Sequence, residues 1–352
     1  MTPAPAPAMR PLSWAEAYRM RLRRRRLLWR SFRARGQLSV VADRTAQIRP
    51  GDILAVMVQR NEATRLPFFL AHYRRLGVAH FLVVDNDSDD GSAEMLAGQA
   101  DVSLWRSGHS YRGARFGLDW MTWLQIRYAH GHWCLMVDAD EILVYAEHET
   151  RGLPELTAWL EAEGRPAFGA LMLDLYPRGP LGAQSYAPGQ DPAEVLGWFD
   201  PGPYRAVRQR PMGNLWVQGG VRERAFFADD PRRSPTLNKL PLVKWNRRYA
   251  YANSTHAMLP PRLNAAYDGP GGSQPSGVLL HSKFLPEIVS RSAVEKARGQ
   301  HFHSPGEFHP YYDRITEAPE LWHEGSVALR DTAQLEALGL MNGAGWRRGA
   351  AG

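Results

Sequence analysis

The sequence of 352 residues predicts an α/β fold with a mostly parallel central sheet and helices on both of its faces. Three observations predict this class. Short continuous apolar runs, typical of strands covered on both faces, alternate with segments whose apolar residues recur every three or four positions. Acidic residues directly follow several of the runs, and a hydrophobic content of 44% suffices for a full core. Regular alternation of strand and helix indicates parallel strands joined by crossover helices.

The expected elements follow one another through residue 137. The first strand covers residues 53–58, and the first helix covers residues 66–76 and ends where Gly77 can supply a C-terminal cap. The second strand covers residues 81–84 and runs into an acidic segment. The later elements are a strand at 102–105, a longer helix at 115–130 and a strand at 133–137.

Acidic residues follow the first, second and fourth of these strands. They are Glu62, Asp85, Asp138 and Asp140. Because ligands of open α/β sheets bind outside the carboxyl ends of the strands, we expect the four side chains to converge. Converging carboxylates repel one another unless a cation or sugar hydroxyls satisfy them. The spacing therefore predicts a binding site at this edge of the sheet.

Asp138 and Asp140 interrupt the apolar stretch 135–144. In an extended segment, residues i and i+2 share a face, so the two carboxylates are expected to point together while Ala139 turns toward the interior. Two hard oxygen ligands with open coordination positions suit Mg²⁺ or Mn²⁺ shared with a diphosphate. An isolated pair of this kind also occurs as an acidic turn at a strand end, but the upstream context favours the metal site.

Three common ligand-binding motifs are excluded by the same residues. A Rossmann turn needs glycines after the first strand, and residues 59–62 contain none. A P-loop needs Gly before its Lys, and no lysine of the chain follows a glycine. An EF-hand loop starting at Asp85 would need Gly where Asp90 stands and Glu where Leu96 stands.

Four segments resemble, in order and separation, the family-2-type glycosyltransferases of the GT-A fold, in particular the bacterial branch related to the family-92 enzymes. The segments are residues 56–62, 72–78, 84–91 and 133–141. They cover the range from residue 52 to residue 145, and the later pieces 239–245, His256 and 279–284 are similar more loosely.

The resemblance implies a nucleotide-sugar donor. The family's second-strand aspartate, here Asp85, contacts the base or ribose, and Asp138 and Asp140 match its D-x-D motif, which holds Mn²⁺ or Mg²⁺ against the donor diphosphate. Such a metal acts as a Lewis acid on the leaving group, and the acceptor hydroxyl needs a base. Glu62 is expected near the nucleotide, or alternatively as an acid favoured by the dipole at the start of a helix.

Two acidic residues of the second half are candidates for the base in an inverting displacement. A strand at 167–173 delivers Asp174 to its end, and residues 216–227 are expected to form another strand, interrupted by Gly219 and Gly220, that carries Glu223. Asp174 is preferred. For either residue the alternative is a capping role at a strand end.

Further residues are predicted to bind the metal or the donor phosphates. His281 follows the apolar run 277–280 and matches a C-terminal histidine of the family that completes metal or diphosphate binding. Lys283 can reach a phosphate as a point charge, and Arg112, like Arg115 and Arg222, can do the same. Ordinary structural or solvated roles are the alternatives.

The first 35 residues differ from the rest of the chain. Ten arginines against one glutamate give them a net charge of +9, and subtracting this from the +7 of the whole chain leaves residues 36–352 at −2. The body therefore carries no basic footprint for nucleic acid. Apolar residues from Trp14 to Phe32 interleave with the arginines, which predicts a basic amphipathic helix on an anionic membrane, or alternatively a disordered solubilising tail.

No secretory or membrane-spanning segment is visible, and Cys134 is the single cysteine, which favours a reducing compartment. We expect a cytoplasmic protein, peripheral on the inner face of the membrane. The predicted organisation is a basic tail or helix at 1–45, a nucleotide-sugar-binding half at 46–150, an acceptor-binding half at 151–300 and a helical extension at 301–352.

These inferences predict a metal-dependent, inverting glycosyltransferase that transfers a sugar from a nucleotide-diphosphate donor to a hydroxyl of a glycan or lipid-linked acceptor, in bacterial polysaccharide or glycan synthesis. Two alternatives remain open. One is a metal-dependent nucleotidyltransferase. The other is a noncatalytic carbohydrate- or membrane-binding protein that retains the fold.

Overall fold

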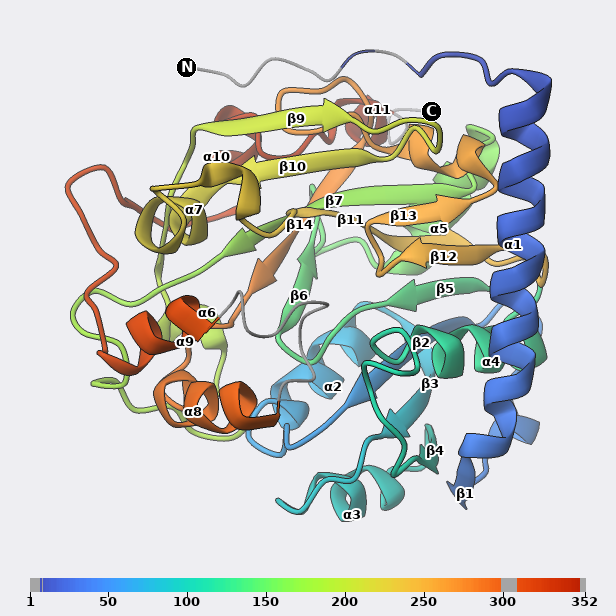
Figure 1. The fold of residues 1–352 in the computed structure, drawn as a ribbon, viewed down its shortest axis with the longest axis horizontal. Coiled ribbons are helices and arrows are strands. Elements are labelled where there is room, and N and C mark those ends of the chain that lie inside the picture. The colour runs from blue at the N-terminus through green and yellow to red at the C-terminus, as the bar shows by residue number, and fades with distance from the viewer. Residues whose placement is uncertain (1–6, 8, 299–308, 349–352) are drawn as a thin grey trace.

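The computed structural model describes residues 7, 9–298 and 309–348, so residues 301–308 and 349–352 of the predicted C-terminal extension lie outside the described residues. A nine-stranded sheet forms the centre of the molecule (Figure 1). Its strands are β1 Ser39–Ala42, β2 Ile53–Gln59, β3 Val78–Asp85, β4 Val102–Arg106, β5 Trp133–Met136, β6 Glu141–Val144, β7 Ala167–Asp174, β11 Asn238–Lys244 and β14 Ser276–His281.

The strand order is β1-β4-β3-β2-β5-β11-β7-β14-β6. Strands β4, β3, β2 and β5 are mutually parallel, and β7 and β14 run in the same direction, whereas β1, β11 and β6 run against them. The predicted α/β class with a mostly parallel central sheet is confirmed.

The helices are α1 Trp14–Ala34, α2 Leu66–Arg75, α3 Ser92–Ala97, α4 Leu118–Tyr128, α5 Leu153–Ala162, α6 Pro192–Val195, α7 Gly220–Phe226, α8 Ile288–Arg298, α9 His309–Thr316, α10 Thr332–Ala337 and α11 Ala344–Arg348. Three small antiparallel pairs complete the structure: β8 Trp198–Phe199 with β15 Val327–Ala328, β9 Tyr204–Arg208 with β10 Leu215–Gly219, and β12 Ala250–Asn253 with β13 Ala257–Leu259.

Helices cover both faces of the parallel part of the sheet. Leu54 of β2 pairs with Cys134 of β5 and with His80 of β3, so these three side chains share one face of the sheet. Helix α4 lies on this face, where its Gln125 Nε2 donates a hydrogen bond to Cys134 Sγ. Phe81 is one residue after His80 and therefore points to the other face, where it contacts Phe69 of α2. Burial on both faces explains why these strands are continuously apolar in the sequence.

Most of the predicted elements of residues 53–137 are confirmed within a few residues. Helix α4 begins at Leu118 rather than near residue 115, because Arg115, Phe116 and Gly117 adopt positive φ angles of 55°, 58° and 74° that a helix cannot continue. The expected strand at 216–227 is wrong in its second half, where α7 begins at Gly220. A Cβ on Gly219 would lie 2.2 Å from the Pro203 carbonyl oxygen, so this close approach requires glycine.

The N-terminal segment contains an ordered helix, α1, that packs on the body. Ser13 and Glu16 form a capping box at its start, and Met20 and Leu27 are buried against Leu259 of β13. Within the described residues, no helix combines the length and the apolar character needed to cross a bilayer.

Candidate active site

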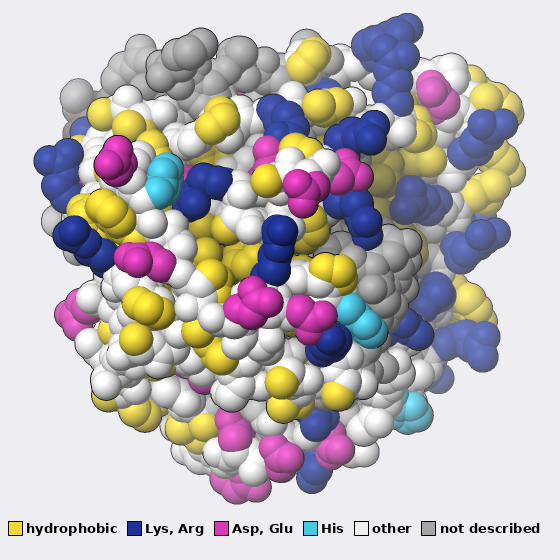
Figure 2. Space-filling model, turned by 60° about the vertical axis from the view of Figure 1, so that its left-hand side comes forward, with side chains coloured by type: hydrophobic (Ala, Val, Ile, Leu, Met, Phe, Trp, Pro, Cys, Tyr) yellow, Lys and Arg dark blue, Asp and Glu magenta, His cyan; other side chains and the backbone are white. Residues whose placement is uncertain are grey.

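A cavity of about 610 Å³ opens at the carboxyl edge of the sheet. Its wall includes the ends of β2 and β14 and the turn that follows β5. It also includes residues near the start of β11 and β6, which begin at this edge because they run in the opposite direction. Among the described residues, eight lysine and arginine side chains and five carboxylates line it. This excess of positive charge suits an anionic ligand. Figure 2 shows basic and acidic side chains interspersed around a hollow with an apolar floor.

Asp138 and Asp140 both line the cavity. They lie in a tight turn between β5 and β6, closed by a 3.0 Å hydrogen bond from Glu141 N to Asp138 O, so the expected extended geometry is wrong. The turn nevertheless places both aspartates at the cavity, as predicted, and Ala139 is buried but lines the cavity with them instead of turning away from it. The Asp138 side chain is half exposed, whereas that of Asp140 is 25% exposed.

His281 lines the cavity and connects Asp140 to Asp174, which lies behind the cavity wall. Its Nε2 lies 3.1 Å from Asp140 Oδ2, and its Nδ1 lies 2.5 Å from Asp174 Oδ1. Pairing of β14 with β6 and β7 places His281 beside Glu141 and Asp174. Burial alone would lower the pKa of His281, but Asp140 and Asp174 raise it above its usual value. In its protonated form His281 donates a hydrogen bond to each carboxylate, and its predicted role as a metal ligand stays a prediction.

Asp140 is held in its ionised form by the same contacts. Burial would raise the pKa of this carboxyl, but His281, Arg65 and Lys283 hold it well below its usual value. The Asp140 carbonyl oxygen also accepts a 2.8 Å hydrogen bond from Ser282 N, which fixes the turn to the end of β14. Asp140 is thus a fixed anion at the cavity surface.

Lys239 supports the other side of the turn. Its Nζ lies 2.7 Å from Glu141 Oε1 and 3.3 Å from Asp138 Oδ2. Glu141 in turn accepts a hydrogen bond from the Asp138 backbone N–H. Burial alone would lower the pKa of Lys239, but Glu141 and Asp138 raise it, so the ammonium stays charged. Lys239 and Glu141 orient Asp138.

Glu62 lines the cavity within an ion-pair cluster that joins α2 to α8. Its carboxylate accepts hydrogen bonds from Arg65 Nη1 at 2.9 Å and from Arg291 Nη2 at 2.6 Å. Arg65 also pairs with Glu287 at 3.0 Å. In this structure the Glu62 carboxylate is paired with both arginines. Its expected position near a nucleotide stays a prediction.

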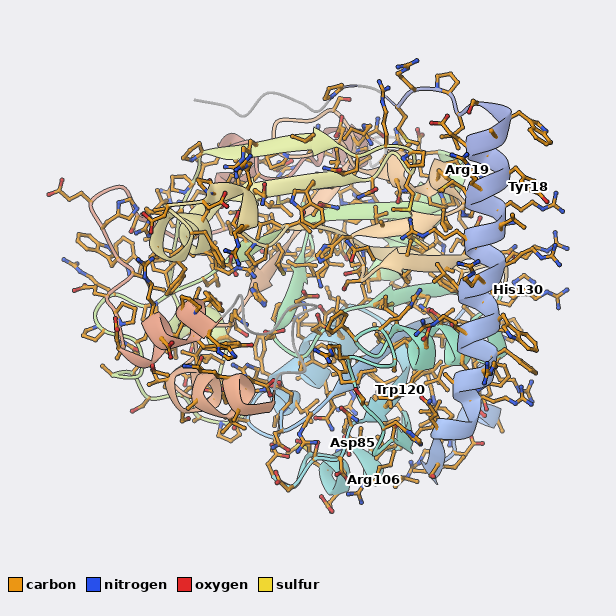
Figure 3. The ribbon with its side chains drawn as sticks, in the orientation of Figure 1. Tyr18, Arg19, Asp85, Arg106, Trp120 and His130 are labelled. Atoms are coloured by element: carbon orange, nitrogen blue, oxygen red, sulfur yellow. The ribbon has the colours of Figure 1, made fainter. Side chains whose placement is uncertain are left out.

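Asp85 ends β3 but lies behind the cavity wall and is fully buried. Figure 3 labels this residue near the chain segments that follow β3 and β4. Its carboxylate accepts hydrogen bonds from Gln59 Nε2 and from the Ser88 backbone N–H and hydroxyl. Gln59 and Asn86, its neighbours in space and sequence, line the cavity instead. A ligand in the cavity could therefore contact the side-chain amides of Gln59 and Asn86 directly. Asp85 orients Gln59 through its hydrogen bond.

The two candidates for the catalytic base do not line the cavity. Asp174 is 4% exposed, and its second oxygen accepts a 2.7 Å hydrogen bond from Arg222 Nε. Glu223 lies on α7 and pairs with Arg205, with a further bond from the Ser234 hydroxyl at 2.8 Å. Both oxygens of each carboxylate are already bonded, and the assignment of either residue as the catalytic base stays a prediction.

The predicted phosphate contacts divide into two groups. Lys283 and Arg222 line the cavity, whereas Arg112 is exposed outside its lining and Arg115 is bound to Asp119. Lys283 Nζ has no ion-pair partner within the described residues, and burial lowers its pKa. Arg222 Nη2 is buried and likewise without a hydrogen-bond partner in that part of the chain. Lys283 Nζ is therefore available to an anionic ligand, whereas Arg222 Nη2 is buried in the cavity wall.

Two carboxylates each have an oxygen that can bind a divalent cation, whereas the third expected ligand, His281, is bonded to one of these carboxylates. Oδ1 of Asp138 and Oδ1 of Asp140 have no hydrogen-bond partner in the described ranges, so each can bind a metal, whereas His281 Nε2 is engaged by Asp140. No group of three or more metal-binding side chains gathers in those ranges. The donor set is therefore an open one, completed by a ligand's own oxygens.

Sequence reasoning missed Lys239, Arg65 and Arg291 as site residues. Lys239 and Asp138 are 101 positions apart in the sequence, and Arg291 and Glu62 are 229 positions apart. Lysine is rare in this chain, and Lys239 stands in an otherwise apolar run, which is the one signal that could have indicated a buried and paired ammonium.

No family model matches the sequence, and no curated protein is significantly similar to it. Many solved structures are similar to parts of the chain, among them the following three. Mannosyl-3-phosphoglycerate synthase from Rubrobacter xylanophilus has a TM-score of 0.24 and 20% identity over 39% of this chain and 47% of that one. The chain thus matches about half of the length of that enzyme.

The second, 4-diphosphocytidyl-2C-methyl-D-erythritol synthase, has a TM-score of 0.23 and 17% identity over 39% of this chain and 68% of that one. The third is a Bacillus anthracis protein assigned as a glucose-1-phosphate thymidylyltransferase and solved with sucrose. It has a TM-score of 0.27 and 9% identity over 74% of this chain and 83% of that one. At these TM-scores the likenesses carry no conclusion about activity.

Proposed function

We propose that the chain is a glycosyltransferase whose cavity binds a nucleotide-diphosphate sugar. One observation carries this proposal. Within the part of the chain that the structure describes, Asp138 and Asp140 each have an unbonded oxygen at a cavity on the carboxyl edge of the sheet, and Lys283 Nζ and Arg222, whose buried Nη2 is unbonded, belong to the same cavity wall. A diphosphate bound to a divalent cation needs both kinds of group. The motif resemblance to family-2-type glycosyltransferases points to the same class.

Each part of the cavity has a distinct task in this proposal. Gln59 and Asn86 would contact the nucleotide, and Lys283 and Arg222 would bind the diphosphate. Asp138 and Asp140 would hold Mn²⁺ or Mg²⁺, which supplies Lewis-acid stabilisation of the departing diphosphate when bound. The His281 contact keeps Asp140 ionised and oriented, and the Lys239 contact orients Asp138, before the donor arrives.

The acceptor hydroxyl attacks the anomeric carbon while the bond to the diphosphate breaks, and its proton passes to a base or to water. Inversion and the identity of this base stay predictions. An acceptor that is a glycan or a lipid-linked sugar would approach past Trp216 and Met172, which line the cavity on the side of the second half of the chain.

A metal-dependent nucleotidyltransferase is the second candidate. Eight basic and five acidic side chains line the described part of the cavity, so basic residues are in excess. This excess favours the second candidate, because its triphosphate substrate carries more negative charge than a diphosphate. In that reaction the attack occurs at the α-phosphate and pyrophosphate leaves. A noncatalytic binding protein would use the same cavity without turnover.

The products of donor turnover separate these candidates. Incubation with a panel of nucleotide-diphosphate sugars and Mn²⁺, with water as the acceptor, should release nucleoside diphosphate and free sugar slowly. Incubation with nucleoside triphosphates and sugar 1-phosphates should release no pyrophosphate. The Asp140→Asn variant should lose the first activity, and Arg330→Gln, an exposed control, should keep it. Pyrophosphate release would instead establish the nucleotidyltransferase, and no turnover in either assay would favour the binding protein.

A further inference from the structure

The outward face of α1 concentrates the exposed apolar side chains of the described part of the chain. The described residues include nine exposed large hydrophobic side chains, and seven of these nine lie between residues 14 and 41, in α1 and the following strand β1. They are Trp14, Tyr18, Leu22, Trp29, Phe32, Val40 and Val41. Scattered exposed hydrophobic residues are ordinary, but a continuous group of this size marks an interaction surface.

The helix docks on the body by its opposite face. With about 3.6 residues per turn, the five exposed apolar residues of α1 lie opposite the buried Met20, Leu27 and Ala34. Arg30 fastens the docked side by a 3.1 Å ion pair to Asp119 of α4. Figure 3 shows Tyr18 on the side of α1 that faces away from the sheet. Within the described residues, the outward face is exposed along the helix, and Phe32 near its end also contacts Trp123 of α4 edge-on.

The exposed rings form a stripe along one side of α1. Trp14 stacks on Tyr18 with ring centroids 5.6 Å apart, and Trp29 stacks on Phe32 at 5.5 Å. A helix of 21 residues is about 30 Å long, so the stripe can lie along a plane. Planar contact suits a membrane surface better than a globular partner, which needs complementary relief.

The same face carries a high density of positive charge. Helix α1 contains eight arginines and one acid, Glu16. Arg21, Arg25 and Arg33 have no hydrogen-bond or ion-pair partner within the described ranges. Arg21 and Arg25 are one turn apart, and like charges at this spacing destabilise an exposed helix. Figure 2 shows arginine and lysine alternating with hydrophobic side chains along the right-hand edge of the molecule, where α1 lies. An anionic surface would offset this repulsion.

We propose that α1 lies in the plane of an anionic lipid bilayer, with Trp14, Leu22 and Trp29 at the headgroup boundary and the arginines on lipid phosphates. Amphipathic helices with aromatic residues and arginines bind membranes in this way. Nucleic acid is a poorer partner because residues 36–352 carry a net charge of −2 and add no basic surface. A second copy of the chain is poorer still, since two such faces repel each other. The proposal does not depend on the proposed function.

Flotation of the full chain with lipid vesicles tests this. Vesicles of phosphatidylcholine with one third phosphatidylglycerol should carry the protein to the top of a density gradient, and pure phosphatidylcholine vesicles should not. Binding should fall at about 1 M salt, where the Debye length is about 3 Å. The triple variant Arg21→Gln, Arg25→Gln, Arg33→Gln should weaken partitioning by roughly 100-fold, and Trp14→Ser with Trp29→Ser should also weaken it strongly.

Matched controls separate a specific surface from general effects. Val207→Ser and Arg330→Gln change an exposed apolar residue and an exposed arginine elsewhere, and both should float like the unmodified chain. All variants alter exposed residues, so circular dichroism and melting temperature should stay unchanged. Flotation of the α1 variants equal to that of the controls would overturn the proposal. So would tighter binding to a DNA duplex than to anionic vesicles, or concentration-dependent dimerisation that the α1 variants abolish.

Discussion

The imidazole of His281 bridges two carboxylates, with Nδ1 2.5 Å from Asp174 and Nε2 3.1 Å from Asp140. Asp174 is bonded on its other side to Arg222, which also lines the cavity. A buried chain of charges thus runs from one wall of the cavity to the D-x-D turn. Its members hold Asp140 in place and ionised, which is the condition for binding a cation.

Replacing His281 with leucine should destabilise the fold by about 3 kcal/mol, because it leaves the buried Asp174 and the turn without their donor. His281→Gln keeps a donor and should lose less. Urea unfolding at pH 6 measures both changes. A loss below about 1 kcal/mol for His281→Leu would show that the bridge contributes little.

The stabilising effect of His281 should depend on pH. Because the folded state raises its pKa above 6.5, its contribution is fully present below that value and is lost as the pH rises through the folded pKa. On the acid side, the lowered pKa of Asp140 means that this contribution fades as the pH falls below about 4. The difference in unfolding free energy between the unmodified chain and His281→Leu should therefore be largest between these limits. A difference that grows from pH 6 to pH 9 would contradict the assignment.

Lys239→Met should cost about 3–5 kcal/mol, because Glu141 would stay buried without its cation. Lys244→Met is the matched control on the same strand. Lys244 pairs with Glu161 at 2.7 Å, but the two side chains are 36% and 50% exposed, so its loss should cost at most about 1 kcal/mol. Thermal and urea unfolding compare the two, and the double variant Lys239→Met, Glu141→Gln should recover part of the loss. Equal losses at the two lysines would argue against a buried pair.

Glu62→Gln should loosen the contact between α2 and α8, because the carboxylate that joins Arg65 and Arg291 loses its charge. Hydrogen exchange should increase in α8 and stay unchanged in β2 and β3. The exposed control Glu94→Gln on α3 should leave both regions as they are. Unchanged exchange in α8 would show that its other contacts are sufficient.

Cys134 should resist alkylation in the folded protein. Burial raises the pKa of its thiol to about 12, so almost no thiolate forms at pH 8. Iodoacetamide should modify the chain in denaturant within minutes and leave the native protein unmodified, as intact mass shows. Rapid modification of the native chain would mean that β5 opens readily.

The parallel half of the sheet was predictable from the sequence because its strands are buried on both faces and are therefore continuously apolar. The antiparallel strand β11, inserted between β5 and β7, was not, because no local pattern specifies which strand pairs with which. This insertion brings Lys239 to the turn. Gly219 and Gly220 were expected to interrupt a strand, whereas their positive φ angles of 137° and 66° end it and begin α7.

The sequence predicted the acidic residues Asp138 and Asp140 of the candidate site. It did not predict the basic residues that pair with the acidic side chains around the cavity. Asp138 and Asp140 were correctly expected to lie together at one site. They do so because of a tight turn, however, and not because residues i and i+2 of an extended strand share a face. Asp85 and Asp174 were expected in the cavity but lie behind its wall, because side chains at a strand end can point along either face and single-sequence reasoning does not determine which.

The central claim is that Asp138 and Asp140 bind a divalent cation together with a nucleoside diphosphate. Calorimetric titration of a panel of nucleoside diphosphates, each with and without Mn²⁺, tests it on the unmodified chain and on Asp140→Asn, with Asp87→Asn as an exposed control. We expect at least one nucleotide to bind only when Mn²⁺ is present, equally well to the control, and at least about tenfold more weakly to Asp140→Asn. Binding that is independent of Mn²⁺ and unchanged in Asp140→Asn would contradict the account.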